Sequence, residues 1–264
     1  MLEIRNIYKT FNKGTINEKK ALNGVNLTLN EGDFVTIIGG NGAGKSTTLN
    51  AVAGVWPVDS GKILIDGKDV SALCEHKRAP WLGRVFQDPM TGTAAGLQID
   101  ENLALAARRG ERRTLRWGIT KAEREQYHEL LKKLDLGLEN RMTSKVGLLS
   151  GGQRQALTLL MATLKKPKLL LLDEHTAALD PKTAAKVLHL TTQLIEENHL
   201  TAMMVTHNMR DALHYGNRTI MMHEGKVLID IDQETKANLH VEDLLKMFEV
   251  QSGSALDNDR MLLG

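Results

Sequence analysis

The feature that most constrains the fold of this chain is the segment GGNGAGKS at residues 39–46. It follows the short apolar run FVTII and precedes KSTTLNAVAG, which is typical of a helix that ends at Gly54. Glycines let backbone N–H groups turn toward phosphate oxygens, and the start of the next helix attracts the same negative charge. The segment matches G-x-x-x-x-G-K-[ST] in the required strand–loop–helix context, which predicts a nucleoside triphosphate site.

Individual positions of this loop carry separate expectations. Lys45 is expected to neutralise the β- and γ-phosphates, and the Ser46 hydroxyl is expected to ligate Mg²⁺. The backbone around them is expected to surround the phosphates. The full set of expected nucleotide contacts in this loop is Gly39, Gly40, Asn41, Gly42, Ala43, Gly44, Lys45, Ser46 and Thr47.

Strand and helix patterns alternate along most of the chain. LEIRNIYK and ALNGVNLTLN alternate apolar and polar residues and predict strands, which we expect to form an N-terminal antiparallel β region. KLLLLDE and LTAMMVTH predict buried strands, each followed by a helical pattern, and NRTIMMHEGKVLID predicts a hairpin that turns at Glu224-Gly225. From about Ile99 to Met142 the spacing is helical, and we expect the helical subdomain to span about residues 88–165. The sequence thus predicts an α/β fold with a mainly parallel sheet and an inserted helical subdomain.

Composition excludes several classes of protein. Lys plus Arg number 34 against 32 for Asp plus Glu, and this near balance argues against a general polyanion binder. The single cysteine, Cys74, excludes an internal disulfide framework and suits a reducing cytoplasm. No run of about 18 apolar residues occurs, so another polypeptide must supply any membrane spans. We expect one domain over residues 1–250 and a C-terminal tail at 251–264.

The segment KLLLLDEH adds a second candidate for phosphate chemistry. Its four leucines predict a buried strand with Asp173 at the carboxyl end, where an aspartate completes a Mg²⁺ shell, often through water. Glu174 is then placed to take a proton from an attacking water. Taken alone, Asp-Glu after leucines is more often a solvated strand end. The loop at 39–46 in the same chain favours the catalytic interpretation.

A further set of motifs resembles ABC-type ATPases. LSGGQ at residues 149–153 resembles the signature of that family, and the resemblance extends over nearly the whole chain. Gln87 in VFQDP matches the family's Q-loop, Asp180 ends the D-loop match AALD, and His207 in MVTHNM matches the switch histidine. Phe11 falls where the family places an aromatic residue that stacks on adenine. Each residue alone is a weak signal; their order and spacing carry the assignment.

The resemblance implies a P-loop NTPase core that closes with a second copy, head to tail, on two ATP molecules with Mg²⁺. Each site then combines the loop of one subunit with the signature turn of the other. A helix is expected to begin near Gln153, so the N–H groups of Ser150, Gly151 and Gly152 form a second anion-binding helix start. The implied catalytic residues are Glu174, His207, Gln87 and Lys45, the implied metal contacts are Ser46, Gln87 and Asp173, and the implied nucleotide contacts outside the loop are Phe11, Ser150, Gly151, Gly152, Gln153 and Asp180.

The family also implies roles and partners. Glu174 acts as the base, His207 holds the γ-phosphate, Gln87 senses the transport subunit and Asp180 links the two sites. The implied partners are a second ATPase subunit, expected to be an identical copy, an integral membrane permease and an extracytoplasmic solute-binding protein, with no nucleic acid. The implied location is peripheral, at the cytoplasmic face of the cell membrane. The helical subdomain is where family members receive the permease.

Some segments depart from the family pattern or keep two interpretations. His175 stands where the family commonly has proline, which puts the rigidity of that turn in question. QRQALTLLMATL lacks the Ala-Arg-Ala run of many importer ATPases; with QDPMTGTAAG, this resembles ATPase subunits of a bacterial tryptophan and tyrosine uptake group. Five arginines within residues 108–116 predict a solvated face, with contact to anionic lipid headgroups as the second interpretation.

The motifs favour an importer of amino acids or related small solutes and leave alternatives open. An exporter ATPase has the same chemistry with a different permease. A soluble ABC protein acting on nucleic acid or ribosomes is the alternative of another class, and a binding module without hydrolysis is a third. The transported solute, the direction of transport and the permease are set by other subunits, so this sequence does not name them.

Overall fold

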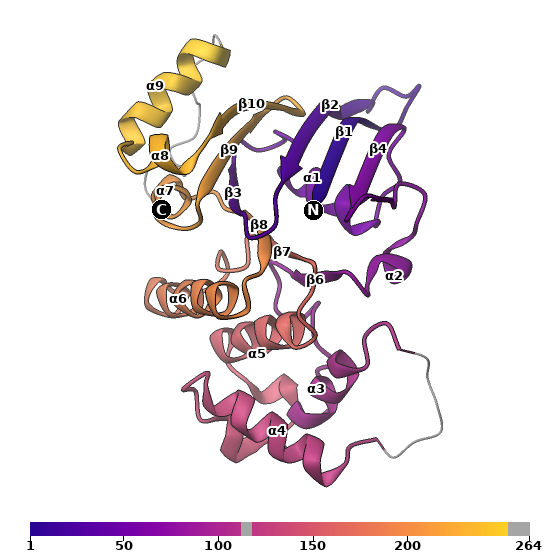
Figure 1. Ribbon diagram of the computed structural model, residues 1–264, viewed down its shortest axis with the longest axis vertical. Helices are drawn as coiled ribbons and strands as arrows, with labels where there is room; N and C mark the ends of the chain where they lie inside the picture. The colour runs from indigo at the N-terminus through magenta and orange to yellow at the C-terminus, as the bar shows by residue number, and fades with distance from the viewer. Residues whose placement is uncertain (112–117, 253–264) are drawn as a thin grey trace. The chain divides into compact units, whose positions relative to one another are not determined.

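The computed structural model describes residues 1–111 and 118–252, and its contacts divide the chain into two units. The first unit contains Met1–Trp81 together with the chain from His199 onward, and the second contains Leu82–Asn198 (Figure 1). Three of the five arginines between 108 and 116, namely Arg112, Arg113 and Arg116, lie outside the described residues, as does the expected tail beyond Ser252.

The N-terminal sheet belongs to the first unit and is antiparallel throughout. Its strand order is β2-β1-β4-β5, formed by β1 (Leu2–Phe11), β2 (Lys19–Leu29), β4 (Ser60–Ile65) and β5 (Lys68–Asp69). Leu2, Ile4 and Ile7 are fully or almost fully buried, and exposed or half-exposed positions lie between them. The predicted N-terminal antiparallel region is therefore confirmed.

A second group of strands in the first unit is mainly parallel. β3 (Phe34–Ile38) pairs in parallel with both β8 (Thr201–Val205) and β9 (Arg218–His223), and β10 (Lys226–Ile231) pairs antiparallel with β9. Every residue of β3 and β8 is buried, as expected for parallel strands that are covered on both faces. The predicted hairpin is confirmed, because Glu224 and Gly225 form its turn with φ of 45° and 73°.

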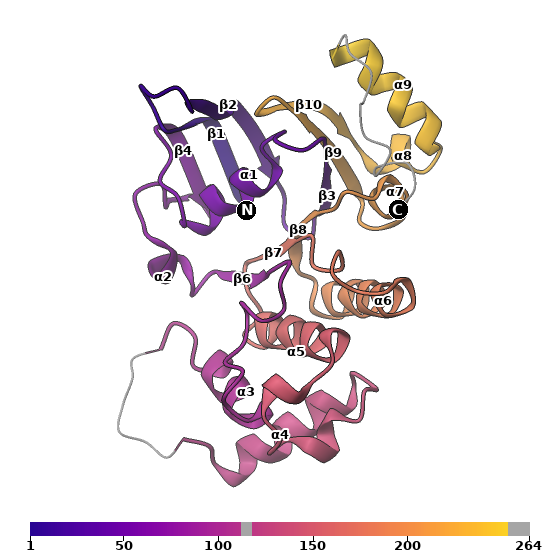
Figure 2. The ribbon, with the colours of Figure 1, turned by 180° about the vertical axis from the view of Figure 1, so that it is seen from behind.

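Helices cover these strands in the first unit. α1 (Lys45–Ala53) contacts β2 and β8 and ends at Gly54 with φ of 82°, as the sequence predicts. α7 contacts β3, α8 contacts β9 and α9 contacts β10 (Figure 2). The sequence analysis did not predict α9, whose Leu244 and Phe248 are buried against the strands. The helices other than α1 are α2 (Glu75–Arg78), α7 (Met209–His214), α8 (Gln233–Lys236) and α9 (Val241–Ser252).

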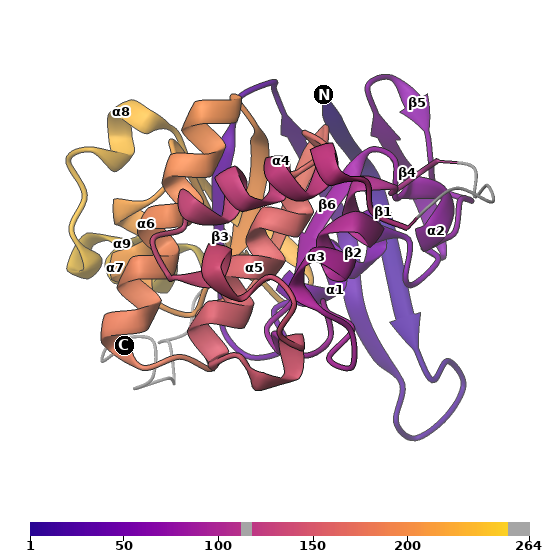
Figure 3. The same ribbon diagram turned by 90° about the horizontal axis from the view of Figure 1, so that it is seen from below.

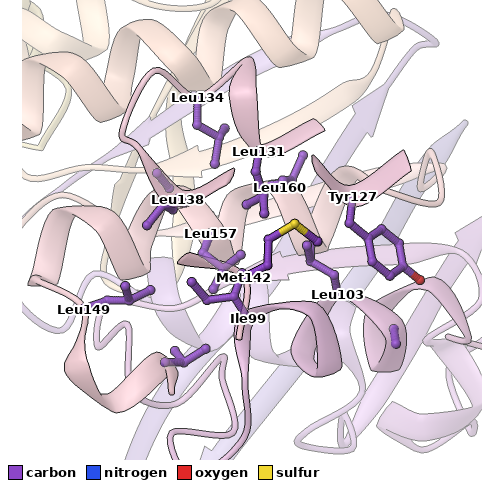
Figure 4. Packing of buried hydrophobic residues seen from close by; sticks show 13 residues of the cluster. Ile99, Leu103, Tyr127, Leu131, Leu134, Leu138, Met142, Leu149, Leu157 and Leu160 are labelled. Atoms are coloured by element: carbon purple, nitrogen blue, oxygen red, sulfur yellow. The ribbon is translucent and has the colours of Figure 1, made fainter. Parts of the chain in front are cut away.

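The second unit is mainly helical around one parallel strand pair, β6 (Leu82–Val85) and β7 (Leu169–Asp173). α5 contacts both α3 and α6 (Figure 3). Apolar side chains that include Leu103, Leu157 and Leu160 form a hydrophobic core in the second unit (Figure 4). The helices are α3 (Ile99–Ala107), α4 (Lys121–Lys132), α5 (Gly151–Thr163) and α6 (Pro181–Asn198), with 3₁₀ turns at Leu138–Arg141 and Val146–Leu148.

The predicted α/β class is confirmed by this combination of an antiparallel N-terminal sheet, parallel strands and helices. Within residues 1–111 and 118–252, no helix is both long enough and apolar enough to cross a membrane.

Candidate functional site

The loop at residues 39–46 joins β3 to α1 and depends on glycine conformations. Gly39, Gly42 and Gly44 have φ of 148°, 80° and 100°, in the left-handed region that favours glycine. A Cβ on Gly39 would lie 2.2 Å from the carbonyl oxygen of Met222, so no other residue fits there. The loop path is therefore fixed by the absence of side chains at these positions.

The N-terminus of α1 has features that favour binding of an anion. Gly44 caps the helix without a side-chain hydrogen bond, and the first turn contains no acidic residue. The first N–H groups of the helix thus have no side-chain acceptor at its N-cap, and the helix dipole favours an anion there. The Lys45 side chain is buried, and its Nζ donates to the carbonyl oxygens of Gly39 at 2.7 Å and Gly40 at 3.4 Å. This places an ammonium group across the same loop.

The turn of the β9–β10 hairpin supports the loop from one side. The Gly225 N–H donates to the Ala43 carbonyl at 3.0 Å, and the Gly225 carbonyl accepts from the Asn23 N–H at 2.8 Å. A Cβ on Gly225 would lie 2.7 Å from the Ala21 carbonyl oxygen. One glycine therefore connects the loop to β2, a link that the sequence analysis missed because its partners are far apart in the chain.

His207 lies at the same end of its strand as the loop. Ile37 of β3 and Val205 of β8 are partners in parallel register, and the Thr206 N–H donates to the Ile37 carbonyl at 3.1 Å. His207 follows directly and is half-buried. The structure therefore brings this histidine and the loop to the carboxyl ends of neighbouring strands, where ligands bind in such sheets.

The helix after His207 is held by a cap. The Asn208 side chain accepts from the N–H groups of Arg210 at 2.8 Å and Asp211 at 3.2 Å. Burial raises the pKa of Asp211, and the nearby imidazoles of His207 and His214 oppose that rise. The carboxyl group of Asp211 therefore belongs to the electrostatic surroundings of His207.

Phe11 ends β1 and is half-exposed. Its ring meets Trp56 edge to face, with centroids 4.8 Å apart, and Lys9 Nζ lies 5.6 Å from its centroid. Phe11 pairs with Lys19 across the first hairpin. A Cβ on Gly42 would lie 3.1 Å from Lys19 Nζ, so this lysine reaches from the hairpin to the loop. The sequence analysis missed Lys19.

In the second unit, parallel pairing aligns the Q-loop match with the acidic pair. Val85 of β6 and Leu172 of β7 are partners, so the exposed Gln87 and the half-buried Asp173 and Glu174 follow the same ends of adjacent strands. Because side chains at such strand ends point to a common edge, this pairing agrees with a shared role.

Arg84 and Gln155, which the sequence patterns did not single out, contact residues at these strand ends. Arg84 Nη2 lies 3.8 Å from Asp173 Oδ2, and the Arg84 guanidinium lies 4.4 Å from the centroid of the Phe86 ring. Gln155, which is fully buried, donates from Nε2 to the Phe86 carbonyl at 3.1 Å. Gln155 thus fixes the residue before Gln87 to α5, which carries the signature.

The signature turn is a capping box at the start of α5. The helix begins at Gly151, two residues earlier than expected, with Ser150 as its cap. Ser150 Oγ accepts from the Gln153 N–H at 3.3 Å, and Gln153 Oε1 accepts from the Ser150 N–H at 3.2 Å. A Cβ on Gly152 would lie 2.2 Å from Thr183 Cγ2, so glycine is needed where α5 meets α6.

Asp180 caps α6. Its Oδ1 accepts from the Thr183 N–H at 3.1 Å, and Pro181 follows as the first helical residue. Hydrogen bonds from the Thr183 side chain and backbone lower the pKa of Asp180. The D-loop match and the signature match therefore contact each other through Thr183. The expected link from Asp180 to another subunit stays a prediction.

His175, which follows Glu174, is fully buried, and its Nε2 lies 3.0 Å from Thr191 Oγ1 on α6. Burial lowers the pKa of His175 to about 4, so the imidazole is neutral near pH 7. Glu174 itself has φ of 44°, which is uncommon for a residue with a side chain. The sequence left the rigidity of this turn in question; the structure places a buried hydrogen bond in it.

The expected residues fall into two sets. The first unit carries Phe11, the loop residues 39–47 and His207, and the second carries Gln87, residues 150–153, Asp173, Glu174 and Asp180. Strand register aligns the loop with His207 in the first unit and Gln87 with Asp173 and Glu174 in the second. Thr183 joins Asp180 to the signature turn.

Comparisons with known proteins agree with these motifs. A family model described as ABC transporter matches residues 22–177. The tyrosine transport ATP-binding protein of Clostridioides difficile (strain R20291) is 43% identical over 249 residues, which cover 94% of this chain and 99% of that protein. The ABC transporter ATP-binding protein YxdL of Bacillus subtilis (strain 168) is 33% identical over 261 residues, covering 97% and 96%.

A solved structure gives the same result. The ATP-binding cassette MJ0796, in a dimeric post-hydrolysis state bound to ADP and Pi, is similar to this chain with a TM-score of 0.75 and 32% sequence identity. The similarity covers 88% of this chain and 99% of that one. The match of the family model and the identity with full-length relatives show that this chain belongs to the ABC transporter family of ATP-binding proteins and is an ATPase.

Proposed function

We propose that residues 1–250 form one ATPase domain, which drives solute import through a separate membrane permease by closing on ATP with a second copy of itself. The observation that carries this proposal is the loop at 39–46, where a helix start without a side-chain cap and the Lys45 ammonium meet on one glycine-shaped backbone. That combination binds a triphosphate.

Each nucleotide contact in the first unit has its own part. Phe11 stacks on the adenine, and the N–H groups of residues 39–47 bind the phosphates with Lys45. Lys19 adds a positive charge beside Gly42, because its ammonium has no carboxylate partner within the described residues. His207 holds the γ-phosphate from the end of the neighbouring strand.

Hydrolysis requires a base, a water and charge neutralisation. Glu174 takes a proton from the attacking water, and Gln87 and His207 orient the reactants. Bringing these groups to fixed positions supplies much of the rate, because phosphoryl transfer needs orientation and electrostatic stabilisation more than covalent chemistry.

The donor set fits Mg²⁺. Ser46, Gln87 and Asp173 offer oxygen atoms, which this hard cation prefers. Within residues 1–111 and 118–252, no three His, Cys, Asp or Glu side chains gather as a metal site. Mg²⁺ usually takes few protein ligands and keeps phosphate and water oxygens as the others, so Ser46, Gln87 and Asp173 would be sufficient to hold it beside ATP. Bound Mg²⁺ neutralises phosphate charge.

The signature turn provides the second half of each site. Gly151 and Gly152 start α5 and offer N–H groups to the γ-phosphate held by the other copy. The Ser150 hydroxyl, which accepts from the Gln153 N–H, keeps its own hydrogen to donate to the same phosphate. Asp180 links the two sites. A C₂ pair with two equivalent sites follows from such a self-complementary contact.

The transport assignment draws on the relatives. The Clostridioides difficile relative is a tyrosine transport protein, which supports an amino acid or related small solute. We propose a permease, an extracytoplasmic solute-binding protein and a peripheral location at the cytoplasmic face of the membrane as the remaining parts of the system. An uptake assay with labelled tyrosine, in vesicles that contain the permease, tests the proposal. We expect uptake only when both ATP and this chain are present.

The substitution Glu174→Gln tests the hydrolytic role. It removes the base but keeps the shape, so we expect ATP binding to persist while phosphate release slows about 10²- to 10⁴-fold. Lys45→Met serves as the contrasting variant, since it should lose ATP binding itself. If Glu174→Gln hydrolyses ATP at the wild-type rate, Glu174 is not the base.

A further inference from the structure

The backbone conformation of Glu174 needs a structural explanation. Its φ of 44° lies in the left-handed region, which is unfavourable for a residue with a Cβ. Such a conformation persists only when the surrounding structure holds it from several sides. The elements on either side of Glu174 are therefore the place to search for what holds it.

The residues before and after Glu174 are both fixed. Leu172 of β7 is fully buried and in register with Val85, which holds the chain before Glu174. His175 is 1% exposed and hydrogen-bonded to Thr191. This hydrogen bond holds the chain that follows Glu174. The Ala177 N–H donates to the Glu174 carbonyl at 3.0 Å, which closes the turn.

The single hydrogen of the Thr191 hydroxyl identifies the donor in the His175–Thr191 hydrogen bond. The Thr191 hydroxyl has one hydrogen, and it donates that hydrogen to the Val187 carbonyl at 2.7 Å. Thr191 Oγ1 is then the acceptor, and His175 Nε2 carries the donated hydrogen. His175 Nδ1 has no partner within the described residues, so this one bond orients the ring.

We propose that the hydrogen bond from His175 to Thr191 positions Glu174, by holding its backbone in the left-handed conformation that aims the carboxylate at the attacking water. The proposal rests on the role of Glu174 given above. Without the bond, Glu174 can relax to negative φ, which turns its side chain in another direction while the phosphate-binding groups of the loop stay in place.

Two adjacent threonines on α6 give a matched test. Thr191 and Thr192 both donate to the carbonyl four residues earlier, at 2.7 Å and 3.1 Å, but in the described part of the chain only Thr191 is also hydrogen-bonded to a histidine. Thr191→Val keeps the side-chain shape and removes the acceptor. We expect kcat for ATP hydrolysis to fall about 10- to 100-fold, the cost of a misplaced catalytic group, with KM unchanged. Thr192→Val should keep kcat within about twofold, and Thr191→Ser, which retains the hydroxyl, should restore it.

A second variant separates positioning from folding. Thr191→Val leaves a buried histidine donor without an acceptor, which lowers stability by itself. The double variant His175→Leu/Thr191→Val removes both polar partners, so it should fold and bind ATP at full stoichiometry while its kcat is as low as that of Thr191→Val. Wild-type kcat in this double variant overturns the proposal, and so does an equal loss of kcat in Thr192→Val.

The Glu174→Gln background distinguishes this proposal from the proposed function. If the bond acts through Glu174, adding Thr191→Val to Glu174→Gln should slow hydrolysis no further. A further loss of the same size means that the bond acts elsewhere, which overturns the proposal and leaves the role of Glu174 standing. Wild-type hydrolysis by Glu174→Gln alone instead removes the proposed function of that residue.

Discussion

At the scale of single residues, long-range contacts decide functions that local sequence does not show. The motif residues Lys45, Asp173 and His207 are recognisable because fixed spacing surrounds each of them. Lys19 and His175 have no such spacing. The role proposed for Lys19 depends on its approach to Gly42, which is distant in the sequence, and the role proposed for His175 depends on its hydrogen bond to Thr191 on α6. Sequence patterns predict which residues belong to a motif, and folding decides which others support them.

The burial of His175 predicts a pH dependence of stability. The unfolded chain binds a proton on this histidine near its ordinary pKa of 6.5, whereas the folded chain binds it only near a pKa of about 4. The unfolded state therefore binds more protons in this window, and stability is lost as pH falls from about 6.5 toward 4. Between pH 7.5 and 5, we expect His175 to account for a loss of about 2 kcal/mol in the free energy of unfolding.

Urea unfolding at the two pH values measures this loss. The double variant His175→Leu/Thr191→Val lacks the titrating group, so its loss should be smaller than that of the wild type by about 2 kcal/mol. Equal losses in the two chains contradict the assignment of a buried, neutral His175.

The position of Lys19 predicts that substitution of two adjacent lysines, Lys19 and Lys20, has different effects on ATP affinity. Its ammonium approaches Gly42, whereas Lys20 is the next residue of β2 and points to the opposite face. We expect Lys19→Met to raise the Kd for ATP about two- to fivefold. This increase in Kd should be smaller at high salt, because salt screens an exposed charge. Lys20→Met is the control and should leave Kd unchanged. Equal effects of both variants in a fluorescent-nucleotide titration mean that only net charge matters.

At the scale of elements, the β9–β10 hairpin shows what sequence predicts and what it does not. Gly225 predicts the hairpin, because tight hairpin turns need residues with positive φ and glycine adopts it readily. That the same turn supports the phosphate loop through Ala43 depends on packing against β2, which no local pattern contains. α9 is a similar case, since Leu244 and Phe248 become core residues only against the strands.

Two glycine turns test the supporting role of this hairpin. Gly225 and Gly67 both occupy hairpin turns with nearly equal φ, 73° and 74°, but a Cβ on Gly67 meets nothing within 4 Å. Gly67→Ala should cost about 1–2 kcal/mol of stability from its φ alone and leave ATP affinity unchanged. Gly225→Ala adds a clash with Ala21, so we expect a larger loss of stability and weaker ATP binding. Identical ATP affinities in the two variants argue against the support.

At the scale of the whole molecule, the order of motifs predicts the family better than any single element predicts its own surroundings. The strand–loop–helix segment, LSGGQ, Asp-Glu and His207 occur in the expected order, and the family match and full-length relatives agree with it. The solute is not predictable at this scale from the chain alone, because in the proposed transport system the solute contacts belong to other subunits. In the proposed dimer the second half of each ATP site comes from another molecule, so the test of this proposal is an assembly measurement.

The most direct measurement is the mass of the Glu174→Gln chain in solution with and without ATP and Mg²⁺, by sedimentation. Because this variant should retain ATP unhydrolysed, we expect a monomer without ATP and a dimer with it. Adding Ser150→Arg blocks the signature turn, so the double variant should bind ATP and stay monomeric. If the Glu174→Gln/Ser150→Arg double variant still dimerises with ATP, or loses ATP binding as a monomer, the proposed role of the signature turn in the dimer is wrong.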